Sequence, residues 1–202
     1  MWDKLADKES VEKVMKELRK NGINSFFVNN EEEARNKIKE IVPNNSHVFT
    51  MSSVTLEETG IANMINESGN YDSVRNKLNS MDRSKPNKEM KLLGAVPEFA
   101  LGSLQALTED GKLMIASNTG SQMAAYVYGS EHVIFVVGTQ KLVKNTNEGI
   151  KRIYDYVLQL ENERVKKAYG IPGSFVSKLL IINREISPNR ITVIFVNKKL
   201  GF

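Results

Sequence analysis

The feature of this sequence that most limits its fold is an unbroken apolar run from Val133 to Val137. Side chains of a strand point alternately to its two faces, so a run without polar alternation indicates a strand that is buried on both faces. Such strands are typical of parallel sheets covered by helices on both sides. We therefore predict that residues 133–137 form a central parallel strand of an α/β domain.

Helical and strand-like patterns alternate through most of the remaining chain. Apolar residues at helical spacing predict helices over residues 8–20, 31–41 and 54–66, with strand-like runs at 23–28 and 47–51. Periodicity is weak over residues 68–91, where we expect an irregular helix-and-loop excursion.

Two late apolar runs complete the expected fold. Leu179 to Asn183 and Ile191 to Val196 are separated by the turn residues Ser187, Pro188 and Asn189, which predicts an antiparallel hairpin. The expected fold class is therefore α/β, with a mostly parallel sheet, helices on both faces and a C-terminal β-hairpin.

Length and composition indicate one globular domain over residues 1–202. The 41% hydrophobic and 26% charged content excludes disordered, collagen-like and coiled-coil chains. The chain has no cysteine, which excludes disulfides, thiolate zinc sites and cysteine-ligated iron–sulfur clusters within it. We expect no cofactor of its own, so a redox centre would have to belong to a partner.

Charge and hydropathy limit which binding partners and which cellular location are expected. The net charge is +4, but basic and acidic residues are interleaved, as over 9–20 and 31–40, so no nucleic-acid partner is expected. No stretch approaches the ~20 apolar residues of a membrane span, and the start lacks an apolar signal core. We expect a cytoplasmic protein without a membrane span.

Candidate ligand-binding residues follow the predicted strands, because ligands of parallel sheets bind beyond the carboxyl ends of the strands. Ser53 and Thr55 lie where a strand passes into a helix, and their hydroxyls suit a phosphate or carboxylate. A helix N-cap is the structural alternative for the same residues. The later loop with Asn118, Gly120, Ser121 and Gln122 is a second source of donors, although Gly120 also suits a tight turn.

Glu109 is the candidate catalytic residue. A carboxylate beside a turn can act as a general base or a nucleophile, although these residues by themselves favour an ordinary acidic turn at Glu109-Asp110-Gly111. Arg184 follows an apolar strand and is a candidate for a carboxylate or phosphate, or for a neighbouring acid. His47 and His132 have no partners at ligand spacing, so no metal site is expected.

Several of these segments together resemble a known family. They are 53–56, 101–111, 118–122 and 136–143, and they are similar to the LUD domain proteins of the lactate-utilisation protein C (YkgG) type. The resemblance implies the NagB/RpiA/CoA transferase-like fold, whose loops receive phosphorylated or acyl ligands. Glu109-Asp110-Gly111 is also similar to the Glu-Asn-Gly context of the catalytic glutamate in coenzyme A transferases.

The sequence leaves two functions open. The resemblance implies a role in bacterial use of L-lactate, as an accessory or small-anion-binding component beside iron–sulfur protein subunits. The alternative is a stand-alone isomerase or acyl/CoA transferase that acts on a small phosphorylated or coenzyme A-linked substrate. The sequence leaves open whether the chain forms a homo-oligomer.

Overall fold

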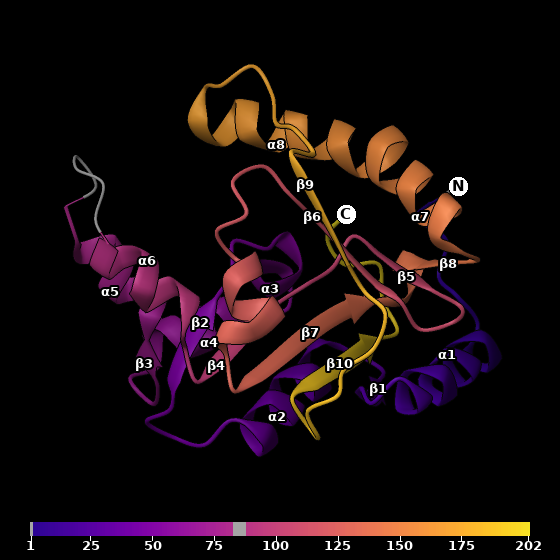
Figure 1. Ribbon diagram of the computed structural model, residues 1–202, viewed down its shortest axis with the longest axis horizontal. Coiled ribbons are helices and arrows are strands. Elements are labelled where there is room, and N and C mark those ends of the chain that lie inside the picture. The colour runs from indigo at the N-terminus through magenta and orange to yellow at the C-terminus, as the bar shows by residue number, and fades with distance from the viewer. Residues whose placement is uncertain (1, 83–87) are drawn as a thin grey trace.

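The computed structural model describes residues 2–82 and 88–202 as an α/β fold with two sheets (Figure 1). The larger sheet has six strands in the order β1-β10-β7-β4-β2-β3, and all neighbouring strands in it are parallel. The smaller sheet has the order β8-β5-β6-β9 and is mostly antiparallel. The strands are β1 (Asn24–Val28), β2 (His47–Thr50), β3 (Asp72–Ser73), β4 (Phe99–Gly102), β5 (Ala106–Thr108), β6 (Leu113–Ser117), β7 (His132–Gly138), β8 (Leu142–Val143), β9 (Lys178–Ile182) and β10 (Ile191–Val196).

Helices connect these strands and cover the large sheet. They are α1 (Lys8–Lys20), α2 (Glu31–Ile41), α3 (Val54–Glu58), α4 (Ile61–Glu67), α5 (Val74–Ser80), α6 (Lys88–Ala95), α7 (Thr146–Arg152) and α8 (Leu158–Tyr169), with the π-helical turns η1 (Ala125–Gly129) and η3 (Ile153–Val157) and the 3₁₀ helix η2 (Thr139–Lys141). The expected excursion over 68–91 contains β3, α5 and the start of α6, and residues 83–87 of it lie outside the described residues.

The prediction for residues 133–137 is confirmed. Strand β7 lies inside the large sheet, between β10 and β4 and parallel to both. Val133, Phe135 and Val137 pack in one core cluster with α1, whereas Ile134 and Val136 pack in a second with α2, α3 and α4. The strand is buried on both faces because each face is covered by different elements.

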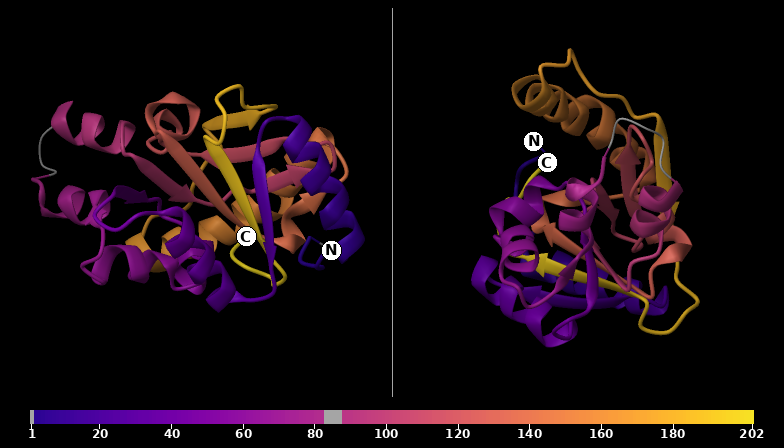
Figure 2. Two further views of the ribbon diagram at one scale, coloured as in Figure 1. Left: turned by 90° about the horizontal axis from the view of Figure 1, so that it is seen from below. Right: turned by 90° about the vertical axis from the view of Figure 1, so that its left-hand side faces the viewer.

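The smaller sheet forms a further layer. Leu107 and Leu113 of this sheet join the core cluster that also contains α1, while Met114 packs in a third cluster with Ile153 of η3. The views in Figures 1 and 2 accordingly show α2 and α8 on opposite sides of the molecule.

The N-terminal helices follow the expected boundaries, and their caps explain why. The side chains of Asp7 and Asn30 accept hydrogen bonds from Ser10 N and Glu33 N at the starts of α1 and α2. The helix expected over 54–66 is instead two helices, α3 and α4, because Gly60 between them has a φ of +70° and interrupts the helical backbone.

The expected C-terminal hairpin needs correction. Both strands form, but β9 pairs antiparallel with β6 in the smaller sheet, whereas β10 pairs in parallel with β1 and β7 in the larger one. All six residues of β10 are buried, as a strand with neighbours on both sides and cover on both faces requires. The short turn signal at 187–189 therefore lies in a connection between two sheets.

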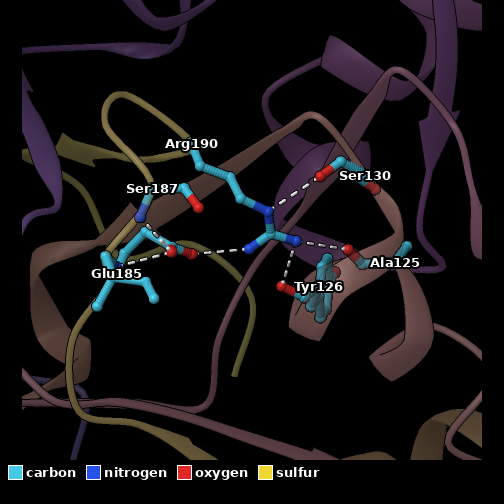
Figure 3. Close-up of polar contacts among 7 residues, drawn as sticks. Ala125, Tyr126, Ser130, Glu185, Ser187 and Arg190 are labelled. Atoms are coloured by element: carbon cyan, nitrogen blue, oxygen red, sulfur yellow. Dashed lines mark hydrogen bonds and ion pairs between the residues drawn. The ribbon is translucent and has the colours of Figure 1, made fainter.

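Arg190 fixes that connection against η1 (Figure 3). Its guanidinium donates hydrogen bonds to the carbonyl oxygens of Ser130, Ala125 and Tyr126 and forms an ion pair with Glu185 at 2.8 Å. Glu185 also accepts from the backbone N–H of Ser187. These bonds join the β9–β10 connection to η1 and to Ser130, which follows it.

Candidate functional site

A pocket of about 330 Å³ lies at the carboxyl ends of β2, β4 and β7, between the two sheets. Polar side chains from several segments line it, together with apolar residues of η3, such as Ile153 and Val157, and the charged residues Glu161 and Arg164 of α8. We call it the strand-end pocket, and the polar lining residues that matter below are Ser53, Thr55, Arg75, Ser103, Asn118, Ser121, Gln122 and Lys141. Its position is the one expected for ligands of a parallel sheet.

Ser53 and Thr55 differ in what their hydroxyls do. Ser53 is the N-cap of α3, and its hydroxyl accepts a hydrogen bond from Leu56 N at 3.4 Å. Thr55 is buried, donates to the carbonyl oxygen of Leu200 at 3.3 Å and accepts from Lys141 Nζ at 3.0 Å. The capping alternative for this segment is therefore formed, and both side chains still line the strand-end pocket.

Lys141 is the most unusual group of the site. Its residue is 2% exposed, and its ammonium nitrogen donates to the hydroxyls of Thr55 and Ser103 at 3.0 and 3.1 Å. Within residues 2–82 and 88–202, no carboxylate lies in ion-pair range of it. Burial lowers the pKa of Lys141 to about 7, because it removes water from the charged form.

The C-terminal segment helps to bury this lysine. Gly201 has a φ of +57°, and a Cβ atom on it would meet the Thr55 hydroxyl at 2.5 Å and Lys141 Nζ at 3.5 Å. The backbone N–H of Gly201 donates to Glu58, and the carbonyl oxygen of Leu200 accepts from Gln140 Nε2. A side chain at position 201 would displace the groups that surround Lys141.

Arg75 provides a positive charge in the strand-end pocket. Its Nε and Nη2 atoms donate to the carbonyl oxygen of Thr50, at 3.0 and 2.6 Å, and its guanidinium lies over the ring of Phe49. Since Thr50 is the last residue of β2, α5 places this arginine at the carboxyl end of the sheet. A guanidinium is suited to a carboxylate or phosphate through paired N–H donors.

The loop over residues 117–122 is shaped by its own hydrogen bonds. The Ser117 hydroxyl bonds to Gln122 Oε1 and accepts from Gly120 N, and Asn118 Oδ1 accepts from Ser177. Gly120 has a φ of +80° and a Cβ on it would lie 2.6 Å from the Lys178 side chain. Asn118, Ser121 and Gln122 line the strand-end pocket, whereas Gly120 supplies the turn.

The structure places Glu109 and Arg184 elsewhere. Glu109 lies in the β5–β6 turn, 47% of its side chain is exposed, and it pairs with Lys13 at 3.1 Å. Arg184 is exposed and lines a separate depression beside Ile186. Neither belongs to the strand-end pocket, so their predicted roles gain no support from position, and Arg190, not Arg184, pairs with the neighbouring acid Glu185.

Sequence reasoning missed Lys141 and Arg75. Lys141 lies in the segment 136–143 that supports the family resemblance, but nothing in the local pattern distinguishes it from a surface lysine. Arg75 lies in the polar segment where periodicity is weak. The only sequence signal is that Lys141 closely follows the buried run of β7, where a parallel sheet binds ligands.

The described part of the chain contains neither a candidate metal site nor a candidate membrane-spanning helix. There, no three His, Cys, Asp or Glu side chains gather as a metal site would require, and His132 stacks on Phe99 with ring centroids 4.7 Å apart. No helix of these residues is long and apolar enough to cross a membrane.

The fold and pocket define an α/β protein with a polar site at the ends of its parallel strands. A family model, the LUD domain, matches residues 11–196, and the chain belongs to this family. Among solved structures, a DUF162 family protein from Deinococcus radiodurans is similar, with 14% identity and a TM-score of 0.59, over 96% of this chain and 100% of that one. This likeness shows the fold alone.

The eIF2B beta protein from Chaetomium thermophilum is a more distant neighbour. It has 10% identity and a TM-score of 0.39, over 69% of this chain and 48% of that one, and supports no argument here. No curated protein matches the sequence significantly.

Proposed function

We propose that this LUD domain protein binds a small carboxylate in the strand-end pocket and acts as a component of L-lactate utilisation. The observation that supports this most is that the guanidinium of Arg75 and the amine of Lys141 line one pocket of about 330 Å³ together with hydroxyls. That volume lies at the small end of ligand sites. Family membership supports the link to lactate.

The remaining parts of the proposal concern partners and location. The chain has no cysteine, so oxidation of lactate through an iron–sulfur cluster would require partner subunits that hold the cluster. A cytoplasmic location and an accessory role beside such partners belong to the same proposal. Genes for iron–sulfur proteins next to the gene for this chain would support it.

Calorimetric titration of the full chain with L-lactate, pyruvate and inorganic phosphate tests the binding step. We expect at least one carboxylate to bind, and Arg75→Met to weaken that binding by about 10-fold or more, since a hydrogen bond to a charged group contributes about 1.5–3 kcal/mol. Arg184→Met is the matched control, because Arg184 is exposed and outside the strand-end pocket. Equal affinity of the wild type and Arg75→Met would contradict the proposed site.

A further inference from the structure

We propose that Lys141 is a nucleophile, and that it forms an imine with the carbonyl carbon of a 2-oxo carboxylate bound in the strand-end pocket. The proposal rests on the proposed function, since the carboxylate must first bind there. It adds a covalent step and a substrate class to a site that otherwise only holds an anion.

The two hydroxyls that contact Lys141 each donate their own hydrogen to a backbone carbonyl oxygen. Ser103 donates to the carbonyl oxygen of Val136 at 2.7 Å, and Thr55 donates to the carbonyl oxygen of Leu200 at 3.3 Å. Both hydroxyl oxygens therefore accept from Lys141 Nζ. A neutral amine has two N–H groups and one lone pair, so these two acceptors use both N–H groups and leave the lone pair unused.

A protonated Lys141 fits this environment less well. The third N–H of an ammonium group has no acceptor among the described residues, where Nζ hydrogen-bonds only to Thr55 and Ser103. Burial favours the neutral form, the positive charge of Arg152 favours it further, and Glu58 opposes it; together they lower the pKa of Lys141 to about 7. A buried lysine that is neutral near pH 7 is the form that attacks carbonyl carbon.

Arg75 supplies the partner for the carboxylate of the substrate. It is anchored on Thr50, which pairs with Leu101 across β2 and β4, and Ser103 follows Leu101 by two residues. Neighbouring strands lie about 4.8 Å apart and two residues of extended chain cover about 7 Å, so the two anchors are within roughly 10 Å. In the proposed complex the carboxylate lies at Arg75 and the carbonyl carbon at Lys141, since both side chains line the strand-end pocket.

The covalent step is balanced without an oxidant or reductant. The lone pair of Nζ attacks the carbonyl carbon, a C–N bond forms, and the π electrons of the C=O bond move to oxygen. The nitrogen loses its two protons to that oxygen, directly or through the Ser103 and Thr55 hydroxyls, and the C–O bond breaks. The products are an imine on Lys141 and one molecule of water.

Reductive trapping tests the proposal. The full chain is incubated at pH 7 with sodium pyruvate and then with sodium borohydride, whose hydride converts an imine into a stable secondary amine that peptide mass mapping locates. About half of Lys141 is neutral at this pH, against less than about one part in a thousand for an ordinary lysine. We expect modification of Lys141 at least 10-fold above that of any surface lysine.

Two variants and one competing ligand test whether the adduct is specific to Lys141 and to the strand-end pocket. Lys141→Met should abolish the adduct, whereas Lys112→Met should not, since Lys112 pairs with Asp110 away from the strand-end pocket. L-lactate, which lacks a carbonyl, should form no adduct and should slow the one formed by pyruvate. If Lys141→Met does not fold, the peptide map of the wild type still decides the matter.

The outcomes separate this proposal from the proposed function. Calorimetric binding of pyruvate without an adduct on Lys141, or adducts spread evenly over surface lysines, would overturn the imine and leave carboxylate binding intact. Neither binding nor an adduct would overturn both. An adduct confined to Lys141 and suppressed by lactate supports both.

Discussion

Replacing Arg190 by methionine should destabilise the fold strongly, because this arginine is central to a buried polar network (Figure 3). Its side chain is 10% exposed and that of its partner Glu185 is 11% exposed. The change removes the ion pair and three hydrogen bonds to backbone carbonyl oxygens. Breaking a buried pair while one charge remains costs about 3–5 kcal/mol, so we expect unfolding free energy to fall by that amount.

Urea and thermal unfolding followed by circular dichroism measure this loss. At about 2–4 °C per kcal/mol for a chain of this size, the melting temperature should fall by roughly 6–20 °C. Arg184→Met is the matched control, and because Arg184 is exposed its effect should stay within about 0.5 kcal/mol. A loss below about 1 kcal/mol for Arg190→Met would refute the reasoning.

The same pair predicts how acid acts on the fold. Burial alone would raise the pKa of Glu185, but hydrogen bonds from Ser187, Arg190 and Ile186 outweigh it and hold the pKa below its usual value. The stabilisation is therefore complete above the unfolded pKa near 4.5 and is lost as pH falls through the lower folded value. Arg190→Met should reduce this acid dependence in unfolding measured from pH 6 to pH 3.

Two further substitutions test the structure at other points. Gly102→Ala should lower unfolding free energy by about 1–3 kcal/mol or more in urea titrations, since its Cβ would lie 1.8 Å from the Tyr126 hydroxyl; full stability would show that this packing is wrong. Glu109→Gln should leave pyruvate binding and the Lys141 adduct unchanged, because Glu109 is exposed and pairs with Lys13; a loss of either would restore the catalytic role first expected of Glu109.

The sequence alone determined the class of fold, and it predicted the end of the sheet at which the strand-end pocket lies. The apolar run of β7 requires burial on both faces, and the capping residues Asp7 and Asn30 set the starts of α1 and α2 within their own segments. These properties depend on neighbours in the chain, so a local pattern is sufficient to predict them. For the same reason the loops with Ser53 and Asn118 could be expected at one end of the sheet.

Only the tertiary structure decided which charged groups the site contains. Lys141 has the sequence context of an ordinary lysine, and its low exposure results from Thr55, Ser103 and Leu200, which lie far from it in the chain. The strand partners were likewise decided by the packed chain: β10 is fully buried between β1 and β7, whereas the partly buried β9 pairs with β6, and a local turn signal cannot predict this difference. Burial is a property of the packed chain, and a pKa that burial shifts is therefore determined only when the chain has folded.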